Sequence, residues 1–447
     1  MRATGTTWVV GVMALGMAGT ARAATVEELE ARLEAQATQI EELRRELGAV
    51  KKAQAVEAAP PVGEQASGKT RSWPERAEQF AKRGEAPSFG GVASKPFLHR
   101  AGGNVYVGGY ADVEFKDSQD ENAAFNQHRL IPFIYADVSD RVKFATEIEI
   151  EEGGPQNNTD DGELKVEFAT IDYLLANAFN LRGGIILSPL GKLNLVHDSP
   201  LQDLTERPLV DQFIIPTTLS EAAMGAFGTL YPTEQSKLEY EAYLTNGFRG
   251  LTGDAAGDVV FNRTNGLRSA RGSEHSDIND EPAAVGRIAF SPWLGWEVGA
   301  SAHLGTYDTQ GKNILGIYAL DTTYQLGPFE FLAEGAYAAI ERNGLARQLG
   351  VPDDMYGYYL QGNYHFMPEF LRRHAPKIFG DESTFTLVNR WDWINLDGNR
   401  LQRYTIGLNF RPIEEMVFKT DFQFNQESGL LDSTENNAVL FSAATYF

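Results

Sequence analysis

The segment VKFATEIEIE at 142–151 alternates strictly between apolar and charged side chains. Alternate residues of a β-strand point to opposite faces, so Ile148 and Ile150 would share one face. The opposite face carries Glu147, Glu149 and Glu151. Carboxylates on one face lie roughly 7 Å apart, and their repulsion of about 0.6 kcal/mol in water rises to about 2.4 kcal/mol at an effective dielectric of 20. The acidic face is therefore expected to contact water, and the apolar face to be dry.

The same alternation recurs along the chain in about sixteen segments, each of about ten residues. The predicted strands begin near Asn104, Gln127, Arg141, Glu163, Asn177, Gly225, Lys237, Ala284, Gly295, Asn313, Pro328, Tyr356, Thr384, Gln402, Met416 and Asn437. Every second connection is long and polar, among them 188–224, 247–283 and 394–401. The others are tight turns except 367–382, which holds either a small helix or two merged connections.

Long loops at one end and short turns at the other are typical of an outer-membrane barrel, whereas a soluble two-sheet protein has no reason to sort them. The predicted fold is an all-β membrane protein, a closed antiparallel transmembrane β-barrel of about 16 strands. Its apolar face would meet lipid and its charged face water. Aromatic residues near segment ends are expected to form interfacial girdles, among them Trp293, Trp391, Trp393 and Tyr446.

Charges keep to one face of the predicted strands, and this face is expected to line the channel. The predicted pore-lining residues are Arg129, Glu147, Glu149, Glu151, Lys165, Glu167, Arg182, Glu239, Glu241, Arg390 and Arg403. For any one of them, a solvated wall position without a role in selectivity is the simpler alternative.

The first hundred residues have a different organisation. A signal peptide is predicted over 1–23, because Arg2 precedes a short apolar run and Ala21-Arg22-Ala23 fits a cleavage site. Apolar residues with 3-4 spacing then predict a coiled coil over 24–53, and its narrow apolar seam favours association with other helices. A linker rich in Pro, Ala, Gly and Ser follows over 54–103, and the barrel is expected over 104–447.

Composition excludes several classes of function. The chain has 447 residues, no Cys, and a net charge of −22. The acidic surplus argues against nucleic acid as a partner, and the absence of Cys excludes disulfides and thiolate chemistry. The seven His do not cluster along the sequence, and no nucleophile or zinc-protease motif occurs. We therefore predict no enzyme activity, no cofactor and no metal site.

The sequence resembles Gram-negative outer-membrane porins, most of all the phosphate-selective porin family. The resemblance covers 104–447 and depends on NVYVGGYADVEF, the hairpin HRLIPFIYADVSDRVKFATEIEIE, the strand FNLRGGIILSPLGKLNL and the last strand NAVLFSAATYF, which ends in an aromatic residue. It implies a homotrimer in which the third long loop, about 188–224, folds into the channel and narrows it. It also places the segment at 26–50 in the periplasm as a support for trimerisation.

The predicted constriction loop departs from a phosphate-selective pattern, because fixed cations replace the hydration of a permeating anion. The predicted constriction residues are Lys192, Asp198, Asp203, Glu206, Arg207 and Asp211. Acids outnumber bases in this set, so we expect a general channel for small hydrophilic solutes and ions with a mild cation preference. Two alternatives stay open: a phosphate- or anion-selective porin, and a tether between the outer membrane and the cell wall.

Overall fold

The computed structural model describes residues 97–447 apart from 103, 156–161, 273 and 430–435. The predicted signal peptide and coiled coil, and most of the predicted linker, lie outside the described residues.

Sixteen antiparallel strands form a closed ring, as predicted. They are β2 (Val105–Ser118), β3 (Ala124–Asp137), β4 (Val142–Glu151), β5 (Glu163–Ala176), β6 (Phe179–Leu187), β7 (Ser220–Leu230), β8 (Lys237–Thr245), β9 (Ala283–Trp293), β10 (Trp296–Thr306), β11 (Ile314–Leu326), β12 (Phe329–Ile340), β13 (Asp354–Phe366), β14 (Thr384–Leu396), β15 (Asn399–Ile413), β16 (Met416–Ser428) and β17 (Ala438–Tyr446). Each strand pairs with the next along the chain, and β17 pairs with β2 to close the ring. Closure leaves no unpaired sheet edge, which is what a membrane-spanning sheet requires.

A short strand, β1 (His99–Gly102), lies in the last residues of the predicted linker. It pairs with β2 at Tyr106 and Val107, just beyond Tyr110, where the pairing of β17 with β2 ends. β1 therefore covers the part of β2 that β17 does not reach.

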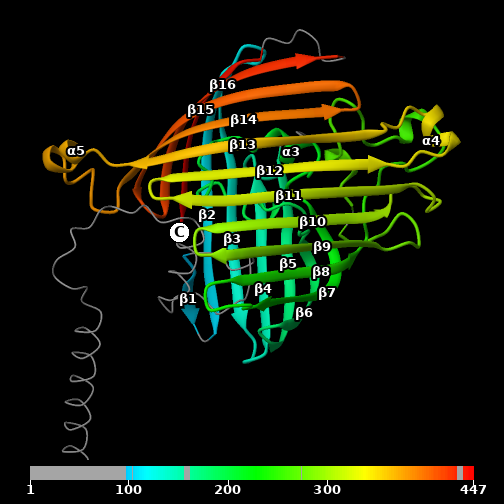
Figure 1. Ribbon diagram of the computed structural model, residues 1–447, viewed down its shortest axis with the longest axis horizontal. Helices are drawn as coiled ribbons and strands as arrows, with labels where there is room; N and C mark the ends of the chain where they lie inside the picture. The colour runs from blue at the N-terminus through cyan, green and yellow to red at the C-terminus, as the bar shows by residue number, and fades with distance from the viewer. Residues whose placement is uncertain (1–96, 103, 156–161, 273, 430–435) are drawn as a thin grey trace, which may run out of the picture. The chain divides into compact units, whose positions relative to one another are not determined.

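The connections are sorted as the sequence indicated, with one correction. The connection predicted as a long loop at 394–401 is a tight turn at Asp397 and Gly398, both with positive φ. The long connection predicted at 367–382, at the end where the other connections are tight turns, contains a small helix, α5 (Glu369–His374). This was one of the two predicted alternatives. In Figure 1, α5 lies at the left end of the strands and α4 (Gly344–Gln348) at the right, long-loop end. Among the described residues, no helix has the length and apolar character needed to span a membrane.

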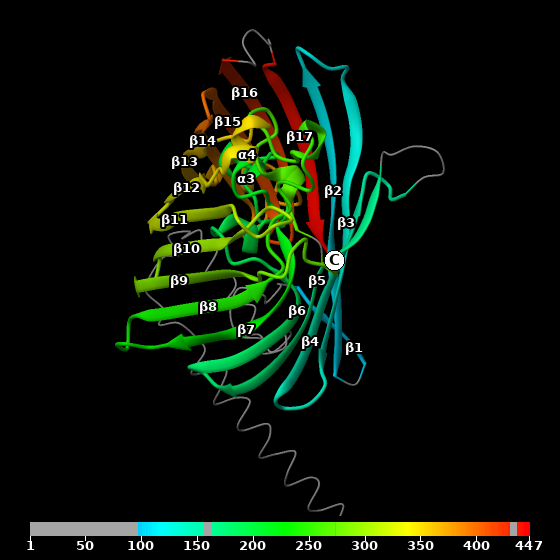
Figure 2. The same ribbon diagram turned by 90° about the vertical axis from the view of Figure 1, so that its right-hand side faces the viewer.

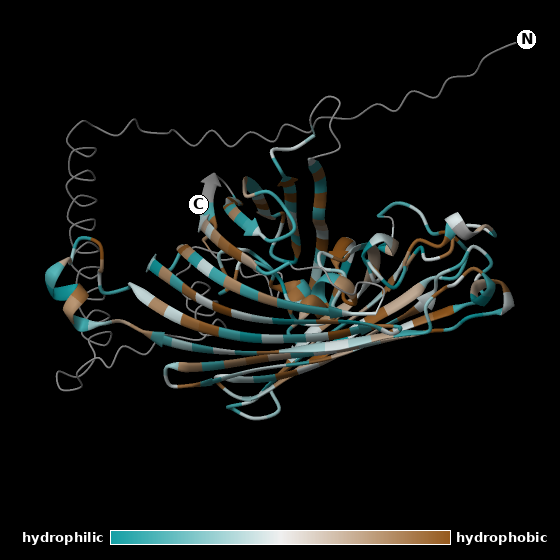
Figure 3. Ribbon diagram, turned by 90° about the horizontal axis from the view of Figure 1, so that it is seen from above, coloured by the Kyte–Doolittle hydropathy of each residue, from teal (hydrophilic) through white to brown (hydrophobic). Residues whose placement is uncertain are grey.

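Apolar and polar residues alternate along the strands, as the banded colours of Figure 3 show. Large apolar side chains on the outer face are exposed, among them Val107, Val113, Ile171, Leu181, Met224, Leu244, Ile288, Leu304, Leu320, Phe331, Leu360, Leu408, Phe422 and Phe441. Charged residues occupy the opposite, inner positions. An exposed apolar surface that encircles a closed sheet is the pattern expected of a barrel in lipid.

Both ends of the inner face are apolar. One cluster combines inner positions near the long-loop end, such as Val285, Ile317 and Ile394, with loop residues. A second cluster at the short-turn end contains Leu98 and Tyr446. The prediction that Tyr446 belongs to an interfacial girdle is therefore wrong, because its ring packs inside the barrel and its hydroxyl donates to Asp198 Oδ2.

Candidate functional site

The barrel interior is the candidate site, and the connection at 188–219 enters it. This loop contains η1 (Leu193–Leu195) and α3 (Leu209–Phe213), and α3 contacts β12, β13 and β14. Figure 2 views the molecule obliquely from the long-loop side, with α3 between β12–β15 and β17–β2. The loop was predicted to reach 224, but β7 already begins at Ser220.

Carboxylates on the wall hold the loop by accepting hydrogen bonds from its backbone. Glu334 Oε2 on β12 accepts from the amides of Lys192 and Leu193, at 3.1 and 3.2 Å. Asp392 Oδ1 on β14 accepts from the amide of Leu209 at 2.9 Å, at the start of α3. Backbone amides at the beginning of a helix have no partner within the helix, so a carboxylate there satisfies a donor and matches the helix dipole.

Arg390 and Asp392 act on the same stretch of the loop from one strand. Arg390 Nε donates to Asp392 Oδ2 at 2.9 Å, and its terminal nitrogens donate to the carbonyls of Glu206 and Arg207 at 3.0 and 3.4 Å. Both wall side chains are buried. We name this arrangement the Arg390–Asp392 clamp.

Three acidic residues of the predicted constriction set, Asp198, Asp203 and Glu206, are bonded to the wall. Asp203 accepts from Asn363 and Asn409 and lies 3.4 Å from the Arg411 guanidinium. Glu206 pairs with Arg403 at 2.6 Å, and this charge, together with Lys116, lowers the pKa of Glu206 although burial opposes the shift.

Two further members of the set have different partners. Asp211 is buried and near Glu334, and both effects raise its pKa well above the ordinary value. Lys192 Nζ reaches Glu297 at 3.1 Å on β10. The structure thus uses most of the acidic surplus of the loop to hold the loop in place.

The predicted pore-lining residues all lie on the inner face, but they differ in exposure. Buried residues are Arg129, Glu147, Glu149, Glu167, Arg182 and Arg390, and partly exposed residues are Glu151, Lys165, Glu239, Glu241 and Arg403. Residues of the first inward loop contact two members of the buried group: His197 pairs with Glu167, and Arg390 donates to loop carbonyls. Wall carboxylates such as Glu147 and Glu149, which the sequence led us to expect in water, are 0% exposed.

These wall charges form networks instead of standing alone in solvent. Arg129 donates to Glu149 and Glu151, and Lys165 lies 2.6 Å from Glu149. Across the strand pair β5–β6, Arg182 makes two hydrogen bonds to Asp172, at 2.7 and 2.8 Å. Buried charges are tolerated when they are paired and hydrogen-bonded in this way.

Sequence reasoning predicted Arg207 as a constriction residue, but it missed two further arginines that complete a group of three. Arg207 comes from the first inward loop, and Arg268 and Arg271 come from the connection at 246–282, which the sequence suggested was an ordinary external loop. Arg207 and Arg268 both donate to the carbonyl of Thr217, and Arg271 donates to that of Thr218. Burial and the charge of Arg129 lower the pKa of Arg207 to about 10.

The connection at 246–282 also folds inward, and it includes η2 (Ala256–Asp258) and η3 (Arg268–Ala270). Its apolar residues Phe248, Phe261 and Leu267 are buried with Val210 and Ile215 of the first loop. The sequence contains only a weak signal that this connection folds inward. At the long-loop end of several strands the inner positions are apolar, and a wall in contact with water does not need apolar residues there.

A cavity of about 60 Å³ lies between the first loop and the inner wall formed by β11–β14. Its lining includes Lys192, Asp321, Glu334 and Tyr359. This volume holds a few water molecules, so the space between loop and wall is narrow.

Comparison with known proteins agrees with this architecture. No protein-family model matches the chain. An uncharacterised protein of Aquifex aeolicus is 28% identical over 353 residues, which cover 74% of this chain and 78% of that protein. Among solved structures, the anion-selective porin of Comamonas acidovorans has a TM-score of 0.50 at 12% identity, and covers 77% of this chain and 99% of its own. Salmonella typhi OmpF, in complex with daunomycin, has a TM-score of 0.50 at 10% identity, with 78% and 100% covered. The chain has the porin fold.

Proposed function

We propose that this protein is a porin of the Gram-negative outer membrane, which forms a water-filled channel for passive diffusion of small hydrophilic solutes and ions. The observation that carries the proposal is the closed ring of sixteen strands with an apolar outer face and a charged inner face. Lipid solvates the first surface and water the second. We further propose a homotrimer, which the sequence resemblance supports.

The channel is proposed to be narrow. Two inward loops pack against the wall, and several charged residues of the inner face are buried beneath them. The charged residues left in contact with solvent inside the barrel include Glu151, Lys165 and Glu241. We therefore expect small conductance steps and exclusion of bulky solutes.

A mild cation preference is the proposed selectivity, and the acidic mouth supports it. The last part of the long connection at 246–282, from 274 to 282, contains Glu274, Asp277, Asp280 and Glu281 without Lys or Arg, and Glu152 follows β4 at the same end of the barrel. Fixed negative charge at an entrance concentrates cations there.

Anion preference is the second candidate, and the three arginines favour it. Arg207, Arg268 and Arg271 donate to backbone carbonyls, and within the described part of the chain none of them forms an ion pair with a carboxylate, in contrast to Arg403 with Glu206. Guanidinium groups deep in a channel replace the hydration lost by an anion. The two candidates place the selective charge at different depths.

Planar-bilayer recording tests the proposal. We expect discrete, ohmic steps from detergent-purified, folded protein, and a reversal potential on the cation side under a KCl gradient. A reversal potential on the anion side, or block by millimolar inorganic phosphate, would favour the second candidate. Absence of steps from folded protein would refute the channel.

A further inference from the structure

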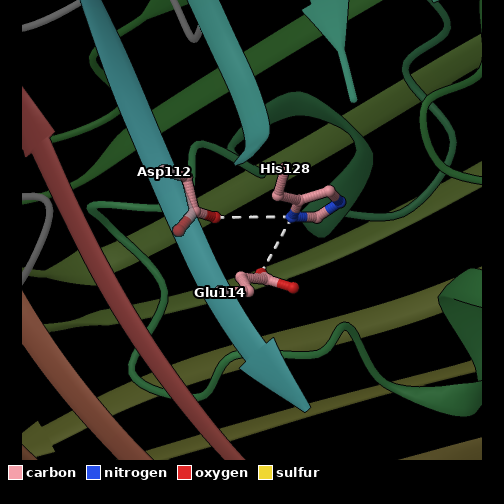
Figure 4. A group of neighbouring side chains, drawn as sticks. All are labelled: Asp112, Glu114 and His128. Atoms are coloured by element: carbon pink, nitrogen blue, oxygen red, sulfur yellow. Dashed lines mark hydrogen bonds and ion pairs between the residues drawn. The ribbon is translucent and has the colours of Figure 1, made fainter. Parts of the chain in front are cut away.

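Three potential metal ligands meet on the inner wall, apart from the loop contacts described above. Asp112 and Glu114 come from β2, and His128 comes from β3 (Figure 4). His128 Nδ1 lies 2.8 Å from Glu114 Oε1 and 3.4 Å from Asp112 Oδ2. The three ligand atoms all lie within 4.8 Å of one another.

A local irregularity of the sheet brings His128 into this group. Asp112 pairs with Arg129 and Glu114 pairs with Asn126, so β3 has one residue more than β2 over this stretch. In a regular strand, His128 and Arg129 would point to opposite faces. A bulge re-aims a side chain in this way, and here the imidazole and the Arg129 guanidinium both contact inner-face carboxylates.

The site carries negative charge that nearby basic residues do not bond. Asp112 is 0% exposed, its Oδ2 accepts no hydrogen bond, and Figure 4 shows this oxygen directed at His128. Arg129 is directed to Glu149 and Glu151, and Lys419 Nζ donates to the carbonyls of Ser199 and Leu204. Among the described residues, His128 is the ion-pair partner of both carboxylates. The Lys419 ammonium is a further positive charge near both acids, but it donates to carbonyls, so the group in direct contact with the two carboxylates is either a protonated imidazole or a bound cation in its place.

We propose that Asp112, Glu114 and His128 bind a divalent transition-metal ion, with Zn²⁺ as the representative. Zinc binds imidazole nitrogen at about 2.0–2.1 Å and carboxylate oxygen at about 2.0–2.2 Å in tetrahedral geometry, so neighbouring ligand atoms lie about 3.4 Å apart. The separations of 2.8 and 3.4 Å from Nδ1 are close to that spacing. A nitrogen ligand disfavours Ca²⁺ and Mg²⁺, which prefer oxygen alone.

Exposure determines how an ion would enter. The side chains of His128 and Glu114 are 25% and 15% exposed, so the site is reached from the lumen, and water supplies the remaining ligand. Binding of Zn²⁺ to the protonated site releases one proton from Nδ1, so the net charge of the inner wall rises by one. A metal-loaded channel is therefore expected to conduct cations less well than the metal-free channel.

The test measures metal binding directly, independent of any channel activity. Folded, detergent-purified protein is stripped with a chelator and titrated with ZnCl₂ in a calorimeter. We expect one Zn²⁺ per chain, and a loss of affinity of about tenfold or more in His128→Gln and in Glu114→Gln. His365→Gln is the matched control, because His365 is likewise an inner-face imidazole but lies near one carboxylate, Glu330, and this variant should bind Zn²⁺ as the wild type does.

Folding of each variant is checked by the shift in gel mobility between unheated and heated samples. As a measurement on the wild type alone, X-ray absorption at the zinc edge should show one imidazole and otherwise oxygen ligands. The proposal is overturned if stripped wild type takes up no Zn²⁺, if His128→Gln binds equally well, or if the zinc edge shows no imidazole.

Discussion

The Arg390–Asp392 clamp gives the sharpest test of how the first loop is held. Asp392→Asn preserves the shape of the side chain, and its amide oxygen can still accept from the amide of Leu209. The amide nitrogen, however, then faces Arg390 Nε, which donates to Asp392 Oδ2 at 2.9 Å in the wild type. Two donors face each other, and a buried guanidinium loses its counter-charge.

The expected cost is large. Removal of one partner of a buried ion pair typically costs about 3–5 kcal/mol. If this loss falls on loop docking, the ratio of docked to undocked loop decreases by roughly two to three and a half orders of magnitude. An undocked loop no longer narrows the lumen. We expect flickering between conductance levels, with brief steps larger than those of the wild type.

The assay is single-channel recording at constant voltage, with thermal unfolding in detergent as the second measurement. Asp172→Asn is the matched control, because Asp172 pairs with buried Arg182 at 2.7 Å on strands β5 and β6. It should lower the unfolding temperature without added current noise. Arg390→Gln combined with Asp392→Asn should recover part of the stability lost in Asp392→Asn, since no charge is then left unpaired.

Two results would refute this account of the clamp. If Asp392→Asn shows wild-type noise and an unchanged unfolding temperature, the clamp does not hold the loop. If Asp172→Asn flickers as strongly as Asp392→Asn, the noise comes from general loss of stability.

Three further predictions concern charge and backbone. Burial and Glu334 raise the pKa of Asp211 in the folded protein. The folded state therefore loses stability relative to the unfolded chain as pH rises above the pKa of about 3.9 that Asp has in the unfolded chain. Asp211→Asn should unfold at a higher temperature than the wild type at pH 8, and this difference should vanish toward pH 3. If acids at the channel entrance cause the cation preference, the preference should fade between 0.1 M and 1 M KCl, where the screening length falls from about 10 Å to about 3 Å. The double variant Arg268→Gln with Arg271→Gln should instead shift the reversal potential toward cations at both salt concentrations. If it shifts the potential at neither concentration, the arginines do not act on permeating ions. Gly191 has φ +69°, and an added Cβ would lie 2.0 Å from Glu334 Oε1. Gly191→Ala should therefore destabilise the docked loop, which would be seen as current flickering and a lower unfolding temperature. Wild-type behaviour of this variant would mean that the loop is not close to Glu334.

The architecture of the barrel could be predicted from the sequence because its signals are local. Alternation such as that at 142–151 is a property of one strand, and it identified both faces without knowledge of any partner. The first predicted strand and the last, near Asn104 and Asn437, correspond to β2 and β17. The tight turn at Asp397 and Gly398 was misjudged because strand ends and polar turn residues look alike in composition.

The candidate site could be predicted only in part. The sequence correctly indicated which charges share a face, but Glu147 was expected in water and is buried. Burial depends on what covers a residue, and the covering loops come from distant parts of the chain. Arg268 was not a candidate for the same reason.

The sequence alone therefore determined the strands, their faces and the sorting of the connections, since each depends on neighbours along the chain. Tertiary structure decided which groups meet: Glu206 with Arg403, the ring of Tyr446 inside the barrel, and His128 beside two carboxylates after a one-residue bulge. These contacts depend on ring closure, on register and on loops that fold back over the wall. No pattern along the chain encodes them, because the free energy of each contact depends on groups that only the closed barrel brings together.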